Sequence, residues 1–154
     1  MAIEGLVSTI IPVYNRPSLV REAIDSVLAQ TYRPIEIMVV DDGSTDSTPQ
    51  VLEQIAAQHD EVQLLRQENE GPGSARQKGL NAARGEFIQF LDSDDLLRPN
   101  KFEWQVEQLR LRPECSVCYG WTTRYPLGGH KQELPVKWTA QRFEAMFPSF
   151  LADR

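Results

Sequence analysis

Cysteine is scarce in this sequence, with two residues among 154. Cys115 and Cys118 form a single C-x-x-C, and both histidines, His59 and His130, lie too far away in sequence to complete a ligand pattern. A structural zinc site needs four ligands, and residues three apart in a strand point to opposite faces of the sheet. We therefore interpret the two cysteines as ordinary strand residues in a protein that a reducing cytoplasm keeps free of disulfides.

Long apolar runs and an excess of basic residues are also missing. The apolar runs extend over about five residues, whereas a membrane-spanning helix needs about 20, and the first residues lack the basic stretch of a secretory signal. Lys and Arg number 16 against 22 Asp and Glu, for a net charge of −6, which argues against a general nucleic-acid-binding protein. A small anionic ligand is compatible with this charge, because a bound metal or a local cation reverses the sign at a site.

What the chain does have is an alternation of strand-like and helix-like segments. Apolar, β-branched segments occupy residues 6–13, 35–40, 62–65, 86–91 and 116–121. Helical patterns occupy residues 18–30, 71–84, 100–111 and a segment that starts near residues 47–49, where Ser47 and Gln50 have capping-box spacing. The alternation predicts an α/β fold, a Rossmann-like three-layer sandwich with a mostly parallel central sheet. A composition of 41% hydrophobic and 25% charged residues is typical of a soluble globular domain.

Three polar clusters follow the ends of predicted strands: residues 14–16, 41–44 and 92–95. Ligands of open α/β sheets bind outside the carboxyl ends of the strands, so we expect these clusters to share one edge. Asp92 and Asp94 form an Asp-x-Asp, and Mg²⁺ or Mn²⁺ takes one or two such carboxylates and completes its shell with water and phosphate oxygens. The alternative is that Asp94 or Asp95 caps the following helix, although the mutual repulsion of three carboxylates in four residues favours a cation.

The other clusters also allow a functional and a structural interpretation. Asp41 and Asp42 precede a glycine and signal a turn, but a carboxylate there could also accept a hydrogen bond from an N–H group of uracil or guanine. Tyr14 could stack on a base or pack at the strand end. Residues 71–74 (Gly-Pro-Gly-Ser) open a helix whose backbone N–H groups could face an anion. Arg76, one turn later, could bind a phosphate or pair with an acidic cluster.

Together, these segments resemble the nucleotide-sugar-binding part of the family 2 glycosyltransferases, which have the GT-A fold. The resemblance covers residues 6 to 121, most of the chain, and its motifs are highly specific in combination. They are residues 8–16 (STIIPVYNR), 24–32 (IDSVLAQTY), 37–45 (IMVVDDGST), 71–79 (GPGSARQKG) and 83–96 (ARGEFIQFLDSDDL).

The resemblance implies inverting transfer of a sugar, typically a hexose, from a nucleoside diphosphate sugar to an acceptor hydroxyl, with a UDP-sugar favoured. It implies Mn²⁺ or Mg²⁺ on the diphosphate, where the leaving group gains negative charge. By motif position, the implied substrate-binding residues are Pro12 and Tyr14 beside the nucleoside, Asp42 at the base with Asp41 next to it, Arg76 near the nucleotide, and Asp92 with Ser93 toward the ribose or donor sugar. The implied metal ligand is Asp94.

The chain departs from the family pattern at the catalytic base, a carboxylate in a later acidic segment of the family. Nothing after Trp121 matches that segment, and Glu133 and Glu144 lack its setting. We therefore expect a donor-binding core over residues 1–125, truncated at the C-terminus, that binds the nucleotide and transfers sugar poorly or not at all. The alternative is a non-catalytic nucleotide-sugar-binding or scaffolding module. A nucleotidyltransferase is disfavoured because residues 14–17 occupy the place of its glycine-rich loop.

Residues 126–154 are expected to begin the acceptor-binding part, with a turn-rich loop over 126–135 and a short helix over 139–147. Their apolar residues could form a self-association patch or pack on the sheet: Trp138, Phe143, Met146, Phe147 and Phe150. The resemblance implies a cytoplasmic location, with peripheral association at the inner face of the membrane as an option, and a role in cell-envelope polysaccharide synthesis. The sequence does not identify the acceptor, which the family draws from glycans, lipids and proteins.

Overall fold

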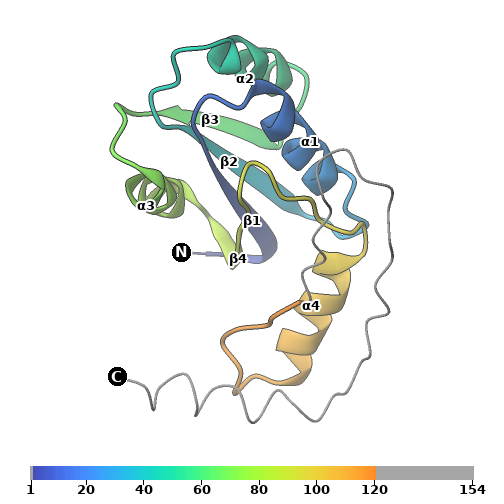
Figure 1. The fold of residues 1–154 in the computed structure, drawn as a ribbon. Coiled ribbons are helices and arrows are strands. Elements are labelled where there is room, and N and C mark those ends of the chain that lie inside the picture. Colours follow the sequence, from blue (N-terminus) through green and yellow to red (C-terminus); the bar gives the residue numbers. More distant parts are fainter. Residues whose placement is uncertain (1, 121–154) are drawn as a thin grey trace. The chain divides into compact units, whose positions relative to one another are not determined.

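The computed structural model describes residues 2–120, and the helices and strands of this part belong to a unit formed by Met1–Cys118. Strands and helices alternate along the chain (Figure 1). The strands are β1 (Ile3–Val13), β2 (Ile35–Asp41), β3 (Val62–Arg66) and β4 (Gly85–Phe90). The helices are α1 (Pro17–Leu28), α2 (Thr48–Ala56), α3 (Pro72–Ala82) and α4 (Lys101–Leu111). The predicted α/β class is confirmed.

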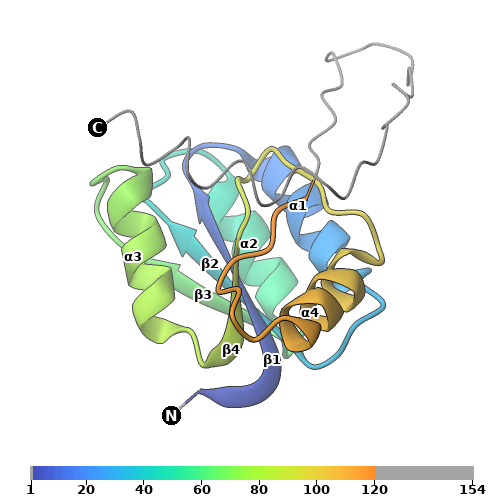
Figure 2. The same cartoon turned by 90° about the horizontal axis from the view of Figure 1, so that it is seen from below.

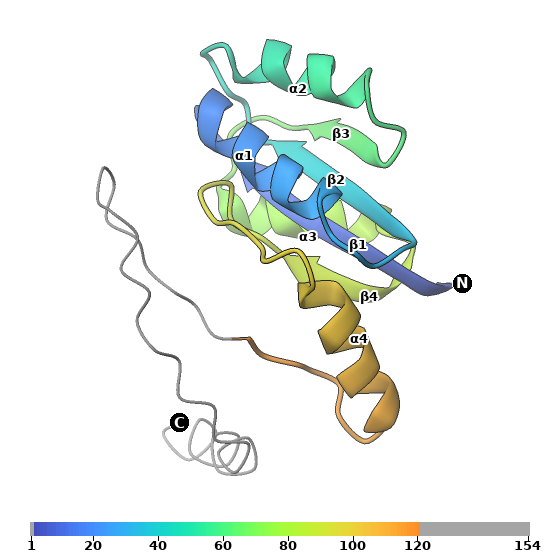
Figure 3. The ribbon, with the colours of Figure 1, turned by 90° about the vertical axis from the view of Figure 1, so that its right-hand side faces the viewer.

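The four strands form one parallel sheet in the order β3-β2-β1-β4. Helix α3 covers one face of this sheet, and α1, α2 and α4 lie on the other face (Figure 2). Helices α1 and α2 contact each other and run side by side along the strands (Figure 3). Because every strand is parallel, all the carboxyl ends meet at one edge, as the sequence predicts.

The core forms on both faces of the sheet because alternate strand residues point to opposite sides. In β1, Val7 and Ile11 belong to the cluster on the α1 and α2 face, and Ile10 packs toward α3. All seven residues of β2 are buried, as in a strand covered by helices on both faces. Gly79 of α3 lies over Ile10, and a Cβ added there would be 2.5 Å from the Cγ2 atom of that isoleucine. The absence of a side chain at Gly79 therefore sets how closely α3 packs on the sheet.

A buried carboxylate stabilises the amino-terminal part of the sheet, away from the ligand edge. Glu36 of β2 accepts hydrogen bonds from Ser8 Oγ at 2.6 Å, from the Arg84 backbone N–H at 2.7 Å and from the Arg84 guanidinium at 2.8 Å. Burial alone would raise the pKa of Glu36, but these hydrogen bonds and the arginine charge lower it below its ordinary value of 4.5. Glu36 is therefore an ionised structural group that ties β1, β2 and the start of β4 together.

The predicted strand over residues 116–121 is wrong for its described part, because residues 116–120 form no strand. Val117 and Tyr119 are each 53% exposed, and the Cys118 carbonyl accepts a hydrogen bond from the Gln105 side chain at 3.2 Å instead of from a neighbouring strand. Cys115 and Cys118 are consequently not strand residues, although both are free thiols. Apolar, aromatic residues favour a strand only where a second strand is available to pair with them.

The predicted capping box at the start of α2 is also wrong. Ser47 makes no side-chain cap, and the Thr48 N–H donates instead to Asp46 Oδ1 at 2.8 Å. In residues 2–120, no helix is long and apolar enough to cross a membrane. The remaining C-terminal predictions lie outside the described residues: Trp121, the loop over 126–135, the helix over 139–147, Glu133, Glu144 and the aromatic patch.

Candidate active site

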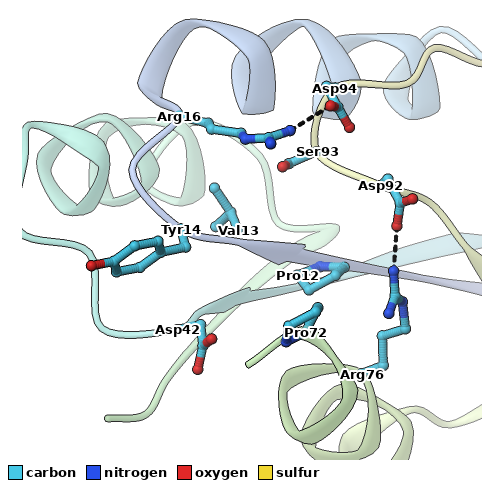
Figure 4. A pocket seen from close by; sticks show the side chains of 10 residues that line it. All are labelled: Pro12, Val13, Tyr14, Arg16, Asp42, Pro72, Arg76, Asp92, Ser93 and Asp94. Carbon is cyan, nitrogen blue, oxygen red and sulfur yellow. Dashed lines mark hydrogen bonds and ion pairs between the residues drawn. The ribbon is translucent and has the colours of Figure 1, made fainter. Parts of the chain in front are cut away.

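A cavity of about 370 Å³ opens at the carboxyl ends of β1 and β2 and at the loop after β4 (Figure 4). It is lined by Pro12, Val13, Tyr14, Arg16, Asp42, Pro72, Arg76, Asp92, Ser93 and Asp94. The structure thus brings together every side chain that the sequence assigned to the site except Asp41. Its additional lining residues are Val13, Arg16 and Pro72.

The chain leaves β1 through a turn that sets both Tyr14 and Arg16 at the cavity. Asn15 has a φ of 53°, in the left-handed region that asparagine tolerates better than most residues. Its Oδ1 atom accepts a hydrogen bond from the Thr45 N–H at 2.8 Å, and its own N–H donates to Ser44 Oγ at 3.0 Å. The loops after β1 and β2 are therefore joined. Tyr14 is 44% exposed, which leaves its ring accessible to a ligand rather than packed in the core.

The two neighbouring aspartates at the end of β2 have different surroundings. Asp41 is 1% exposed and does not line the cavity. Its Oδ1 atom accepts a hydrogen bond from the Ser44 N–H at 2.9 Å, and Oδ2 lies 3.3 Å from Arg66 Nε as an ion pair. Gly43 has a φ of 75° and lies so close to Asn69 that a Cβ would be 2.8 Å from its backbone nitrogen. The segment is thus the turn that Asp-Gly indicates, and it also supplies Asp42 to the cavity wall.

Asp42 connects the cavity to the segment before α3. Its Oδ1 atom accepts hydrogen bonds from Gln67 Nε2 at 2.8 Å and from the Glu70 N–H at 2.9 Å. Its Oδ2 atom accepts one from the Gly71 N–H at 2.9 Å. A carboxylate has about four acceptor positions, so these three donors leave one for a ligand N–H. Asp42 fixes the start of α3, and through α3 it also fixes the position of Arg76.

Each aspartate of the Asp-x-Asp faces an arginine across the cavity (Figure 4). Arg76 Nη2 of α3 donates to Asp92 Oδ1 at 2.5 Å, and Arg16 Nη1 donates to Asp94 Oδ2. The Asp92 and Asp94 side chains are 54% and 48% exposed. The two carboxylates are therefore accessible, and their present partners come from the opposite walls of the same cavity.

The third carboxylate of this loop, Asp95, does not line the cavity. Desolvation, followed by the negative charges of Asp92 and Asp94, raises the pKa of Asp95. The alternative that Asp94 or Asp95 caps the next helix is wrong, because α4 begins only at Lys101, with Asn100 before it. The acidic loop therefore concentrates negative charge without a capping role.

The family model described as "Glycosyl transferase family 2" matches residues 8–151. The chain belongs to glycosyltransferase family 2. It is 38% identical over 112 residues to "Putative glycosyltransferase EpsH" of Bacillus subtilis (strain 168), an alignment that covers 73% of this chain and 33% of that protein. The chain thus spans about a third of the length of this relative.

Solved structures of glycosyltransferases share the fold. S. aureus TarS (residues 1–349) in complex with UDP-GlcNAc has a TM-score of 0.64 and 31% identity, over 70% of this chain and 32% of that one. The mannosyltransferase PcManGT from Pyrobaculum calidifontis, in complex with GDP-Man and Mn²⁺, has a TM-score of 0.63 and 31% identity, over 67% and 32% of the two chains. These similarities confirm the family and the GT-A fold expected from the sequence motifs.

The donor atoms of this family 2 site fit a divalent cation held jointly with a ligand. In the part of the chain that the structure describes, no group of three or more His, Cys, Asp or Glu side chains could enclose a metal ion. Two exposed carboxylates, Asp92 and Asp94, face one cavity. Mg²⁺ and Mn²⁺ commonly take one or two carboxylates and fill the remaining positions with water and substrate phosphates. The site therefore fits such an ion whose shell is completed by water and by a phosphorylated ligand.

Sequence reasoning grouped Arg16 with Tyr14 but gave it no role. Its partner Asp94 lies 78 residues away in the sequence, and no local pattern links the two. The available signal was its position, directly after a strand that leads into the predicted ligand edge. The sequence also could not show which of Asp41 and Asp42 lines the cavity, because the two residues are adjacent and of the same type.

Proposed function

We propose that this domain binds a nucleoside diphosphate sugar together with Mn²⁺ or Mg²⁺, and positions the sugar for inverting transfer to an acceptor hydroxyl. The observation that carries the proposal is the meeting of the Asp-x-Asp carboxylates with two guanidinium groups in one cavity, next to Tyr14 and Asp42. The bound UDP-GlcNAc of TarS and the GDP-Man and Mn²⁺ of PcManGT support this ligand class. A UDP-sugar, with a hexose as its sugar, is the first candidate.

In this proposal, the nucleoside lies at the end of the cavity formed by β1 and β2. The half-exposed ring of Tyr14 offers a stacking surface, and Pro12 adds an apolar contact. The remaining acceptor position of Asp42 would receive an N–H of the base. Uracil and guanine both present such a group, so Asp42 alone does not select between them.

The diphosphate lies between the opposed acidic and basic side chains. Asp94 would hold the cation, Arg76 would bind phosphate oxygens, and Asp92 with Ser93 would contact the ribose or the donor sugar. When the bond to the sugar breaks, the nucleoside diphosphate gains negative charge. A divalent cation and fixed positive groups stabilise that charge where it develops.

We expect the 154-residue chain to bind the donor without efficient transfer. Among the described cavity residues, Asp42 is held by three protein donors, and the Asp-x-Asp carboxylates face the proposed cation. Neither position suits a general base that must contact the acceptor hydroxyl. We propose that this base lies outside the described residues. A non-catalytic binding module is the alternative, with the same ligand and no turnover in any context.

The biological setting is also a proposal. We expect the protein to act in the cytoplasm, with peripheral association at the inner face of the membrane and self-association as options to be tested. We infer an acceptor from cell-envelope polysaccharide synthesis, of glycan, lipid or protein type. The net charge of −6 makes nucleic acid an unsuitable partner.

Calorimetric titration tests the central assignment. UDP, UDP-GlcNAc, GDP and GDP-mannose are titrated into the wild type, Asp94→Asn and Asp25→Asn, with and without Mn²⁺. Asp25 is exposed on α1 and does not line the cavity, so its variant controls for the loss of one negative charge. We expect Mn²⁺ to raise the wild-type affinity for at least one nucleotide by about tenfold, equivalent to about 1.4 kcal/mol.

The Asp94→Asn variant should lose most of this metal effect, and Asp25→Asn should keep it. An equal metal response in all three proteins would remove Asp94 from the metal site. Absence of binding for all four nucleotides would reject the proposed function. Acceptor-dependent turnover by the 154-residue chain would contradict the expectation that it binds the donor without efficient transfer.

A further inference from the structure

We propose that Arg16 and the divalent cation compete for Asp94, and that the diphosphate resolves this competition by accepting the Arg16 guanidinium. Arg16 would then be a ligand-binding residue that couples the affinity for the cation to the affinity for the nucleotide. The inference rests on the proposed function and adds to it a residue with no role in the sequence-based assignment. The observation behind it is the hydrogen-bonded ion pair between Arg16 Nη1 and Asp94 Oδ2.

The backbone of Arg16 is fixed, but its side chain is not enclosed. The Arg16 N–H donates to Thr48 Oγ1 at 3.0 Å, and its carbonyl accepts from the Val20 N–H at 3.0 Å. Its side chain is 44% exposed. The guanidinium can therefore exchange partners by rotation about side-chain bonds, with no change in the turn before α1.

The Asp94 carboxylate cannot serve both partners well. A dication on Asp94 would lie next to the guanidinium that donates to Oδ2 of the same carboxylate, and the two positive charges would repel each other. Both side chains of the ion pair are about half exposed, at 44% and 48%, so the pair is weak and exchangeable. Phosphate oxygens are the natural second partner, because the planar guanidinium binds them through paired hydrogen bonds.

The other arginine of the cavity is held differently. Arg76 extends from within α3 and is 35% exposed, and its partner is Asp92. Its ion pair leaves Asp94 accessible. Arg16 is therefore the basic residue of the cavity that directly occupies the carboxylate assigned to the cation.

Charge balance predicts the direction of the coupling. Three carboxylates and two guanidinium groups line the cavity, for a net charge of −1. A dication reverses this sign and favours the diphosphate, and the diphosphate in turn removes Arg16 from Asp94. Each ligand should therefore raise the affinity for the other by the same factor.

The test measures Mn²⁺ binding directly, by the electron paramagnetic resonance signal of the free ion, with and without UDP. Calorimetry measures UDP binding without metal. The proteins are the wild type, Arg16→Gln, Arg16→Lys and Arg21→Gln. Arg21 lies on α1 and does not line the cavity, so its variant controls for the loss of one positive charge. Circular dichroism verifies that each variant is folded.

Without UDP, we expect Arg16→Gln to bind Mn²⁺ about three- to fivefold more tightly than the wild type, because an exposed ion pair contributes about this factor. It should bind UDP alone several-fold more weakly, and the factor by which UDP promotes Mn²⁺ binding should shrink. Arg16→Lys, which keeps the charge, should resemble the wild type more than Arg16→Gln does, and Arg21→Gln should match the wild type.

If Arg16→Gln binds Mn²⁺ with the affinity of the wild type, Arg16 does not compete with the cation for Asp94 and the inference is wrong. The inference is also wrong if Arg21→Gln gains as much Mn²⁺ affinity as Arg16→Gln does. These results leave the proposed function intact as long as Mn²⁺ and UDP bind together. If no protein binds Mn²⁺ even with UDP present, the proposed function itself fails, and this inference fails with it.

Discussion

Replacing Asp42 by asparagine changes one carboxylate oxygen into an NH₂ group at the junction between the cavity and α3. In the wild type, Oδ1 accepts from Gln67 Nε2 and the Glu70 N–H, and Oδ2 accepts from the Gly71 N–H. All three protein groups are donors. An asparagine has only one acceptor oxygen, so in either orientation of its amide it can accept hydrogen bonds from only some of these three donors.

The better orientation places the amide oxygen at the Oδ1 position. It retains two hydrogen bonds but sets the NH₂ group against the Gly71 N–H, so one hydrogen bond is lost and two donors face each other. Hydrogen bonds to charged groups contribute about 1.5–3 kcal/mol each, and the two that remain are weakened by the loss of charge. Because Asp42 is only 4% exposed, water cannot readily replace the missing acceptor. We expect the free energy of unfolding to fall by about 2 kcal/mol.

Urea denaturation measures this loss, with Asp25→Asn as the control for charge at an exposed position on α1. Calorimetry on the same samples measures UDP affinity, which should fall by about tenfold or more, because the variant loses the acceptor for a base N–H and loosens the start of α3. A variant as stable as the wild type would show that the three hydrogen bonds do not hold this segment. A destabilised variant with unchanged UDP affinity would separate Asp42 from ligand binding.

Three further predictions concern stability and use urea denaturation of each variant beside the wild type. Glu36→Gln should lower the free energy of unfolding by about 2 kcal/mol at pH 7. Because the pKa of Glu36 is lowered in the folded state, this difference from the wild type should vanish as the pH falls below 4.5. A difference that stays constant with pH would refute the prediction. Burial lowers the pKa of Lys101 to about 8, so the stability of the wild type relative to Lys101→Met should rise by roughly 2 kcal/mol between pH 7 and 9.5, where the unfolded chain binds more protons. Gly79→Ala should lower the free energy of unfolding by about 1–2 kcal/mol, because the added methyl group overpacks α3 against β1. Gly73→Ala should cause no such loss, because a Cβ at Gly73 meets no atom within 4 Å. Equal losses in the two variants would refute the packing argument.

The sequence predicted the layers of the fold well because the controlling signals are local. The continuous apolar segment over residues 35–40 is β2, buried throughout, and the apolar stripe of residues 20, 23, 24 and 27 is the buried side of α1. The strand predicted over 116–121 failed over residues 116–120 because pairing is not local. Its apolar and aromatic residues resemble those of a strand, but their exposure depends on whether a neighbour is present.

The site was predictable at the level of loops and not at the level of atoms. Parallel topology alone brings the ends of β1, β2 and β4 together, so the sequence pattern is enough to assign Tyr14, Asp42 and Asp94 to one edge of the sheet. The partners of these side chains could not be assigned. Three donors for Asp42 arise from a segment that precedes α3, and the arginine opposite Asp94 comes from the start of α1.

The arginines also explain how an acidic protein can offer a site to an anion. With a net charge of −6, the chain as a whole repels a nucleoside diphosphate, and the acidic loop after β4 adds to that repulsion locally. Arg16 and Arg76 reduce the cavity to a single net negative charge, which still opposes the free nucleotide. One dication is enough to reverse the sign. A third arginine in the cavity would make nucleotide binding less dependent on metal, whereas in this cavity the cation and the nucleotide should each strengthen the binding of the other. We therefore expect metal dependence to follow from the charges of the cavity walls as much as from coordination by Asp94.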